Sequence, residues 1–272
     1  MSRMGALCVR SPWLVAVVAI GCVGAPGASQ APVSTQPSSV PVPSIDATPT
    51  PIPSGPLRLI GCRDGQHCKV APGSYFTGPA GFFPGLEITI PANWFLTEQD
   101  SGELSLHPND HPGDALLLWK DVRVVATTRR SGPANEIVQE VARTPEAFVE
   151  WFTTSSDFTV IEDPTATTIA GTSGTFLAVE VSKSADYGDP GCPSNPRCAD
   201  FVTDPAHWGP NFFAVGGDEA VRLYVATIRY GDFDHLFVVA WDTPSAAELQ
   251  AFEGQVGDIL DTIRLPAAFI KN

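Results

Sequence analysis

The sequence predicts an α+β fold in which a mostly antiparallel sheet is covered by at least two helices. Three observations predict this fold: runs of alternating apolar and polar residues joined by hairpin-length turns, two capped segments with helical periodicity, and strands that outnumber helices. Residues 58–272 contain all of these elements without a second linker, and they suffice to bury a sizeable core. We therefore expect one globular domain over this range.

The first clear strand is expected over residues 86–91, where three aliphatic side chains alternate with polar ones. Alternation at period two is typical of a strand with one buried face. Short strands over 94–97 and 103–106 follow. The longer apolar run at 115–127 predicts either two strands that meet near Lys120 or one strand that spans the sheet.

More strands are expected in the second half of the domain. Residues 158–162 and 165–169 predict two short strands, and residues 174–182 alternate again. The clearest hairpin joins 221–230 to 235–241 through a turn rich in Gly and Asp.

The first predicted helix follows Thr144, which can cap it, and Pro145 suits its first turn. Its apolar face consists of Phe148, Trp151 and Phe152, which recur at three- and four-residue spacing.

The second predicted helix opens at Ser245, with Glu248 three residues on as a capping box. Apolar residues then recur at helical spacing as far as Ile263. Gly254 and Gly257 weaken this helix without abolishing it.

The N-terminus is similar to a bacterial lipoprotein signal: two arginines precede a short apolar run at 13–20, and Gly21 stands before Cys22. The run is far shorter than the roughly 20 apolar residues that cross a bilayer, which disfavours a transmembrane anchor. We expect residues 1–21 to be a signal peptide and Cys22 to carry lipid. An ordinary secretory signal is the alternative.

Residues 22–57 comprise the expected lipidation site and a linker rich in Pro, Ser and Thr. From residue 23 onward the linker has nine prolines, nine Ser or Thr residues and a single charge, Asp46. Such a composition cannot form a core and predicts a disordered, extended segment. At about 3.1 Å per residue it reaches on the order of 100 Å, so it would hold the domain away from the membrane. O-glycosylation of the linker stays open.

The chain carries a formal net charge of −14, and loss of the two signal arginines lowers it to −16. Only four lysines occur, and Arg129–Arg130 is the sole basic doublet. Nucleic-acid binding needs clustered Lys and Arg, so the composition disfavours it. The acidic balance favours solubility and repulsion from an anionic membrane surface, and recruitment of cations or basic partners is the alternative.

Four cysteines remain in the expected domain, and five residues separate Cys62 from Cys68 and Cys192 from Cys198. In an exported chain an even set predicts disulfides, and local pairing needs the fewest assumptions. A seven-residue loop contributes about 2.4 kcal/mol in the loop-entropy model, against about 5 for a bridge from Cys62 to Cys192. The cross-linked connectivities stay open. Spacing and compartment disfavour a zinc site of these cysteines, although His67 lies nearby.

The sequence contains no Gly-x-Ser-x-Gly elbow, Ser-x-x-Lys pair, helical His-Glu-x-x-His motif, calcium loop or phosphate-binding glycine loop. The one metal-like spacing is His107 and His111 with Asp114, but neighbouring prolines prevent a helix from holding both imidazoles on one face. A polar turn is favoured there. His235, at the start of an apolar strand, is expected to be a hydrogen-bonded sheet residue. We predict no catalytic residue, cofactor or metal.

Residues 186–217 show little periodicity and contain Trp208, Phe212 and Phe213 beside one expected disulfide. Long stapled loops in compact domains are usually functional, so these aromatic residues are predicted to form a partner surface. The alternative is that they cover one face of the sheet.

Several stretches are similar, in the same order, to a group of uncharacterised secreted or lipid-anchored bacterial proteins: residues 72–75, 83–84, 86–94, 169–174 and 259–263. The layout more distantly resembles the Mog1/PsbP-like fold, in which an antiparallel sheet lies between helices. The resemblance covers most of residues 58–265 and rests on turns and strand patterns. It implies a binding or scaffold domain, and the cysteine-bearing loop has no counterpart in that core fold.

These features together predict a lipid-anchored protein on the extracytoplasmic side of the cell membrane, carrying a non-enzymatic binding or sensor domain. Its expected partners are the membrane, through the lipid, and a protein or small-molecule ligand in the envelope, with no nucleic acid. Two alternatives stay open: an envelope hydrolase with an unrecognised site, and a structural envelope protein. A deep pocket with converging polar groups would separate an enzyme from a protein-binding module.

Overall fold

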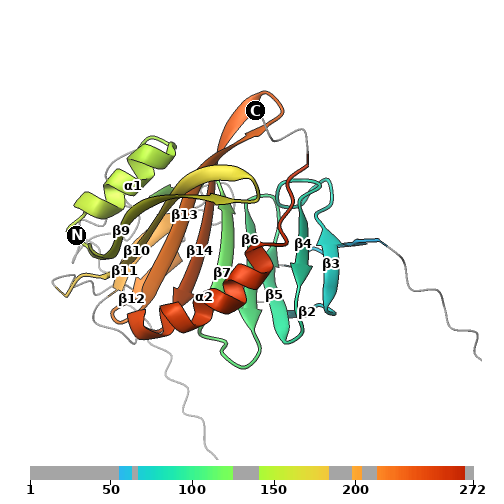
Figure 1. Ribbon diagram of the computed structural model, residues 1–272, viewed down its shortest axis with the longest axis horizontal. Coiled ribbons are helices and arrows are strands. Elements are labelled where there is room, and N and C mark those ends of the chain that lie inside the picture. Colours follow the sequence, from blue (N-terminus) through green and yellow to red (C-terminus); the bar gives the residue numbers. More distant parts are fainter. Residues whose placement is uncertain (1–54, 63–66, 125–140, 184–197, 204–212, 267–272) are drawn as a thin grey trace, which may run out of the picture. The chain divides into compact units, whose positions relative to one another are not determined.

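The computed structural model describes residues 55–62, 67–124, 141–183, 198–203 and 213–266, all within a unit formed by Pro51–Asn272 (Figure 1). The expected signal peptide, Cys22 and nearly all of the linker lie outside the described residues, so those domain boundaries stay predictions. The described elements are, in chain order, β1 (Leu57–Arg58), β2 (Cys68–Lys69), β3 (Gly73–Phe76), β4 (Glu87–Ile90), β5 (Trp94–Gln99), β6 (Glu103–Pro108), β7 (Ala115–Lys120), β8 (Arg123–Val124), α1 (Pro145–Thr154), β9 (Phe158–Ile169), β10 (Thr172–Val181), β11 (Cys198–Thr203), β12 (Phe213–Gly216), β13 (Ala220–Tyr230), β14 (Phe233–Thr243) and α2 (Ala246–Leu260).

The central element is an eight-stranded sheet with the order β2-β5-β6-β7-β14-β13-β10-β9. Every neighbouring pair in it is antiparallel. Two three-stranded sheets accompany it, with the orders β1-β3-β4 and β12-β11-β8. Within the described part of the chain, the one parallel pair joins β1 and β3. A mostly antiparallel sheet packed against two helices confirms the predicted α+β class.

Each face of the large sheet carries its own hydrophobic core, because neighbouring residues of a strand point to opposite faces. Tyr224 and Ala226 of β13 belong to the core on the α2 face, whereas Leu223 and Val225 belong to the core that contains α1 and β11. Helix α2 packs on β14, β13 and β4, and α1 packs on β9, β10 and β13. Figure 1 shows α2 lying across the central strands.

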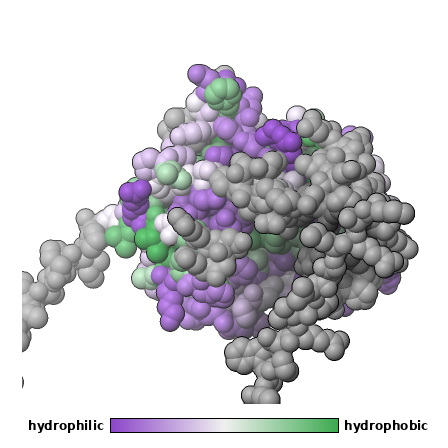
Figure 2. All heavy atoms as spheres, turned by 180° about the vertical axis from the view of Figure 1, so that it is seen from behind, coloured by the Kyte–Doolittle hydropathy of each residue, from purple (hydrophilic) through white to green (hydrophobic). Residues whose placement is uncertain are grey.

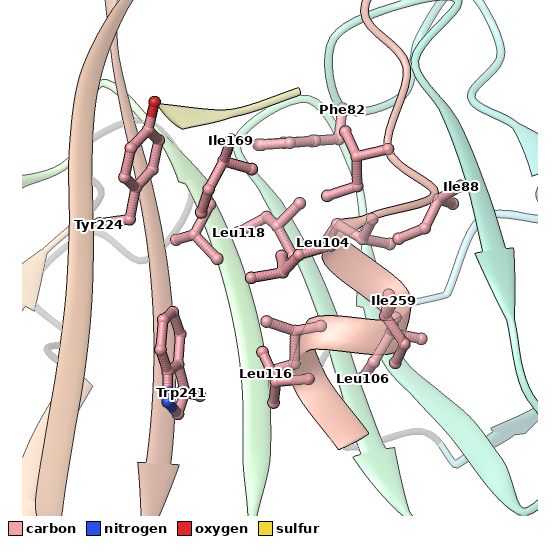
Figure 3. Packing of buried hydrophobic residues seen from close by; sticks show 14 of the residues in the cluster. Phe82, Ile88, Leu104, Leu106, Leu116, Leu118, Ile169, Tyr224, Trp241 and Ile259 are labelled. Atoms are coloured by element: carbon pink, nitrogen blue, oxygen red, sulfur yellow. The ribbon is translucent and has the colours of Figure 1, made fainter. Parts of the chain in front are cut away.

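The core beneath α2 is built from aliphatic side chains of β6 and β7 and from the inner face of the helix. Figure 3 shows Leu104, Leu106, Leu116 and Leu118 gathered near Ile259, and none of the five is measurably exposed. Burying a side chain of this size contributes about 1.5–3 kcal/mol each. This core therefore fixes α2 on the sheet.

Helix α1 begins as the sequence predicts. The Thr144 hydroxyl accepts a hydrogen bond from the Ala147 backbone N–H at 3.3 Å, and Pro145 occupies the first turn. Phe148 and Phe152 are buried, whereas Trp151 on the same side is only half-buried. The predicted apolar face is therefore confirmed for the two phenylalanines.

Helix α2 also begins where the capping box predicts. The Ser245 hydroxyl donates to the Glu248 carboxylate at 3.0 Å and makes no hydrogen bond to the helix backbone. The box therefore joins two side chains instead of satisfying the first N–H groups. The helix ends at Leu260, three residues before the predicted limit, and Ile263 follows it as a buried residue.

The predicted hairpin is confirmed as β13 and β14, which pair without a break from Ala220 opposite Thr243 to Tyr230 opposite Phe233. The two-residue turn contains Gly231, whose φ of +60° is in the left-handed region that glycine adopts without strain.

The chain changes sheets after β7. The run at 115–127 forms two strands, β7 in the large sheet and β8 in the β12-β11-β8 sheet, as one of the two predictions had it. Asp121, with a φ of +57°, stands between them.

The prediction of two short strands over 158–169 is wrong, because β9 runs through the whole segment. Thr165 pairs with Phe176 and Glu162 pairs with Ala178, so two residues of β9 lie opposite one of β10. This bulge contains Pro164 at the sheet edge, where its missing N–H costs no ladder bond.

The interpretation of 186–217 as one long loop is also wrong in part. Strands β11 and β12 both lie within it. All six residues of β11 are buried, so the strand shows no alternation of apolar and polar residues. That is why periodicity did not reveal it.

Candidate functional site

The first predicted disulfide is confirmed: the sulfur atoms of Cys62 and Cys68 are 2.04 Å apart. Cys62 is buried and forms an isolated bridge with Gln99, while Cys68 in β2 pairs with Leu96 of β5. The bond therefore links two short segments that both pair with β5. It also excludes these two thiols from the zinc alternative.

Cys198 is fully buried at the start of β11 and is itself disulfide-bonded. Cys192 lies outside the described residues, so the pairing of Cys192 with Cys198 stays a prediction.

A pocket of about 770 Å³ opens beside the Cys62 disulfide. Three segments meet around it: residues 58–62, the loop at 78–81 and the end of β5 at 98–100. This volume lies in the range of roughly 300–1,000 Å³ that small-molecule sites occupy. The lining residues are Arg58, Leu59, Ile60, Gly61, Cys62, Gly78, Ala80, Gly81, Glu98, Gln99 and Asp100.

Gln99 holds the three segments together. With its amide oriented to satisfy its neighbours, the nitrogen donates to the Ile60 carbonyl at 3.0 Å and the oxygen accepts from the Phe82 N–H at 3.3 Å. The Gln99 backbone N–H donates to the Cys62 carbonyl at 2.9 Å. Only 6 % of the residue is exposed. The floor of the pocket is therefore a pre-formed hydrogen-bonded junction.

Charged side chains reach the pocket from two different segments. Arg58 lies against Gly78, since a β-carbon placed on that glycine would be 2.5 Å from Arg58 Nε. Glu98 and Asp100 come from β5 and the turn that follows it. Asp100 Oδ1 accepts from the N–H groups of Gly102 at 2.6 Å and Glu103 at 2.9 Å, which fixes its carboxylate. The described lining therefore carries both signs of charge beside apolar side chains.

The rim of the pocket has an apolar part. Ile60, which lines the pocket, is 55 % exposed, and Leu57, next to Arg58 in the chain, is 44 % exposed; among the described residues they are two of three exposed large hydrophobic side chains. Figure 2 shows hydrophobic surface at the edge of the domain that carries β1 and β3, surrounded by hydrophilic surface. Exposed apolar side chains beside a pocket are common at ligand sites.

The histidines of the metal-like spacing do not converge. The ring of Phe95 lies between His67, at 4.6 Å, and His107, at 5.4 Å, and both imidazoles stack on it. The Asp114 N–H donates to the His111 carbonyl at 2.9 Å, which closes a turn. Burial lowers the pKa of His107, and interactions with the nearby backbone offset this only in part. Within the described ranges, no group of three His, Cys, Asp or Glu side chains could hold a metal ion.

His235 is hydrogen-bonded within the sheet, as the sequence predicts. Its Nδ1 lies 2.6 Å from Asp121 Oδ2, and Asp121 Oδ1 accepts from the Leu236 N–H at 3.0 Å. The rings of Phe83 and Tyr230 both have centroids 6.1 Å from the imidazole. Asp121 and Phe83, with a φ of +35°, both have left-handed backbone conformations. A carboxylate that fixes an imidazole is the geometry of a general base.

Carboxylates gather at the other end of β14. Burial, followed by the charges of Glu219 and Asp114, raises the pKa of Asp242 well above its ordinary value. Asp242 Oδ1 has no hydrogen-bond partner among the described residues. Burial also raises the pKa of Asp114. Asp242 and Asp114 are thus acids whose neutral forms are favoured by burial.

The predicted partner surface is described only at Phe213. Its half-buried ring lies 5.2 Å from Trp119 and 6.2 Å from Phe201, so it helps to cover the large sheet. Trp208 and Phe212 lie outside the described residues, and their role stays a prediction.

Sequence reasoning missed the pocket. Its walls come from segments far apart in the chain, and neither Gln99 nor Arg58 belongs to a motif. The available signal was the density of glycines at residues 55, 61, 78, 81 and 85, since bare backbone allows segments to approach closely. As for membrane insertion, none of the helices formed by the described residues is long and apolar enough to span a bilayer.

No protein-family model and no curated protein matches this chain. Among solved structures, it is similar to cyanobacterial PsbP (CyanoP) from Synechocystis sp. PCC 6803, with 9 % identity, 73 % of this chain and 95 % of that chain covered, and a TM-score of 0.37. It is also similar to LpqN, involved in cell envelope biogenesis of Mycobacterium tuberculosis, with 10 % identity, coverage of 76 % and 90 %, and a TM-score of 0.37. A PsbP protein is thus among the solved structures to which the chain is similar.

Proposed function

We propose that this chain is a membrane-anchored, extracytoplasmic binding protein without enzymatic activity, and that its domain takes a small ligand in the pocket beside Cys62 and Cys68. The observation that carries the proposal is the pocket of about 770 Å³, bounded by a buried amide junction and by charges of both signs. A pre-formed pocket with a few fixed polar groups is the usual form of a small-molecule site.

The disulfide supports the compartment. Stable disulfides form in oxidising environments and are rare in the cytosol, so the Cys62–Cys68 bond favours an exported chain. The signal-like N-terminus with Cys22 points in the same direction. The Pro-rich linker then acts as the spacer between lipid and domain.

The lining of the pocket supports binding over catalysis. Among the described residues, it contains no histidine, serine, threonine or tyrosine, and the one cysteine there is held in a disulfide. A hydrolytic site needs a nucleophile beside a base. The described lining therefore suits binding of a ligand more than hydrolysis of one.

Anchoring is tested by the Cys22→Ser variant of the full chain expressed in a bacterial host. The parent should stay in the membrane fraction, because the several acyl chains of a lipoprotein hold it stably. The variant should move to a soluble fraction. Equal membrane retention of both forms would reject the lipid anchor.

Ligand binding is tested by filling the pocket. Gly61 lines it, and a β-carbon there would meet only one atom within 4 Å, Gln99 O at 4.0 Å, so Gly61→Trp adds a ring without a clash at its base. Gly254 on the exposed side of α2 has nothing within 4 Å, which makes Gly254→Trp the matched control. A small-molecule extract of bacterial envelope should raise the unfolding temperature of the parent and the control but not that of Gly61→Trp. Equal shifts in all three proteins, or none in the parent, would reject the pocket as the binding site.

A hydrolase is the second candidate, and the hydrogen bond of 2.6 Å between His235 and Asp121 is the observation that favours it. If it is correct, the full chain should hydrolyse an activated ester such as p-nitrophenyl acetate faster than buffer does, and His235→Asn should remove that excess. Equal rates of parent and variant would leave the binding role alone.

A further inference from the structure

We propose that the pocket recognises a small dipolar ligand, one that carries an ammonium group and a carboxylate a few bonds apart, such as a short peptide with free ends. This inference rests on the proposed function and names its ligand class. It follows from which segments carry the charges, from the residue types of the described lining and from the exposed backbone at Gly61.

The charges are separated by segment. Arg58 belongs to β1 and lies against Gly78, whereas Glu98 and Asp100 belong to β5 and its turn. No ion pair of Arg58 occurs within the described part of the chain. A guanidinium presents a planar fork of donors that fits a carboxylate, and carboxylates accept the N–H groups of an ammonium. One wall therefore suits an anionic group and another suits a cationic one.

Other ligand classes fit the lining less well. No aromatic side chain is among the described residues that line the pocket, so a nucleobase would find no stacking surface there, which contributes about 1–3 kcal/mol per base. Among the same residues two carboxylates stand against one guanidinium, which disfavours a phosphate or another multiply charged anion. A bare hydrocarbon chain would make no hydrogen bond with the charged side chains of this lining.

Glycine backbone gives the pocket a further property. Gly61, Gly78 and Gly81 all line it; Gly61 is exposed, whereas Gly78 and Gly81 are buried and the Gly81 N–H donates to the Gly78 carbonyl at 2.9 Å. Exposed N–H and C=O groups can pair with the amide of a bound peptide. A short peptide thus matches the site by charge at its two ends and by hydrogen bonding between them.

Isothermal titration calorimetry on the full chain in detergent tests this with a matched series of probes: L-alanyl-L-alanine, its N-acetyl form and its C-terminal amide. The unmodified dipeptide should bind saturably. The N-acetyl form loses the ammonium and the amide loses the carboxylate, so each should bind at least tenfold more weakly.

Single substitutions assign the two ends. In Arg58→Gln, the dipeptide and its amide should bind with equal affinity, while the N-acetyl form stays weaker. In Glu98→Gln, the preference for the free ammonium should fall instead. Gly78→Ala displaces the Arg58 guanidinium, which is a flexible group, and should copy Arg58→Gln. Arg143→Gln and Glu150→Gln change exposed residues that do not line the pocket, and they should bind like the parent.

The inference is overturned if none of the three probes binds saturably, if both capped forms bind as well as the dipeptide, or if Arg58→Gln and Glu98→Gln keep both preferences. The envelope extract could raise the unfolding temperature of the parent but not of Gly61→Trp, while the dipeptide fails to bind. That result would overturn the ligand class and leave the pocket as a binding site. If neither response occurs, both proposals fall.

Discussion

Removing the Gln99 side chain should loosen the pocket and the edge of the sheet together. Its amide joins the Ile60 carbonyl to the Phe82 N–H, and no other side chain is seen to bond these two groups within the described residues. Gln99→Ala would leave both without that partner. The cost depends on whether water can replace the amide at each position.

The two positions differ in exposure. Phe82 is fully buried, so its N–H would lose its partner without gaining water, at a cost of about 1–3 kcal/mol. Ile60 is 55 % exposed, and its carbonyl can be hydrated, which limits that loss to about 0.5–1 kcal/mol. The expected total is about 1.5–4 kcal/mol. For a domain of this size each kcal/mol lowers the unfolding temperature by about 2–4 °C.

Urea unfolding of the oxidised full chain, followed by tryptophan fluorescence, measures the change in free energy. Gln250→Ala, on the exposed side of α2, is the matched control and should stay within about 0.5 kcal/mol of the parent. A Gln99→Ala protein as stable as this control would refute the assignment of Gln99 as the junction.

Two further substitutions test bonds that span elements. Replacing Cys62 and Cys68 together by Ala should lower the free energy of unfolding by at most about 2.4 kcal/mol, because the loop they close has seven residues; a larger loss in urea unfolding would show that the bond also holds the adjacent strands. Arg222 forms ion pairs with Glu162 of β9 and Glu253 of α2, and Arg222→Met should lower the free energy of unfolding by about 1–2 kcal/mol. This loss is smaller than that expected from breaking a fully buried ion pair, because both glutamates are about half exposed. Arg229→Met, at an exposed pair, is the control and should change stability by under about 0.5 kcal/mol; equal effects would contradict the difference in burial.

Local patterns predicted the parts of the fold that local interactions decide. Thr144 and Ser245 mark the helix starts, and the hairpin turn at Gly231 is determined by a φ that glycine adopts freely. Pairs of cysteines with five residues between them predicted the Cys62–Cys68 bond for the same reason. These features depend on residues that are close together in the sequence, so a sequence pattern can predict them.

Features that depend on distant contacts were missed or were wrong. Strand β11 is buried on both faces, so its sequence lacks alternation, and the bulge at Pro164 hides the continuity of β9. The pocket is formed by Arg58, Gly78 and Gln99, which are brought together only when β1, the loop after β3 and β5 pack. No residue spacing in the sequence indicates that these three residues lie close together.

Asp242 provides a test of the buried carboxylates, since its pKa is raised well above the ordinary value by burial, with Glu219 and Asp114 adding to the effect. A carboxyl group with a higher pKa in the folded state binds more protons when folded than when unfolded. The free energy of unfolding therefore falls as pH rises from about 4, the pKa of an unfolded Asp, through the folded pKa. Asp242→Asn removes this contribution and keeps the shape of the side chain.

The variant should accordingly gain stability relative to the parent as pH rises from 4 to 8, with the smallest difference at pH 4. Urea unfolding at several pH values measures both proteins, and subtracting the two curves cancels the titration of groups that they share. Asp163→Asn, at an exposed position in β9, is the control and should follow the parent at every pH. A difference between Asp242→Asn and the parent that stays constant with pH, or that shrinks as pH rises, would mean that Asp242 is ionised in the folded protein, and its carboxylate would then need a cationic or hydrogen-bonding partner.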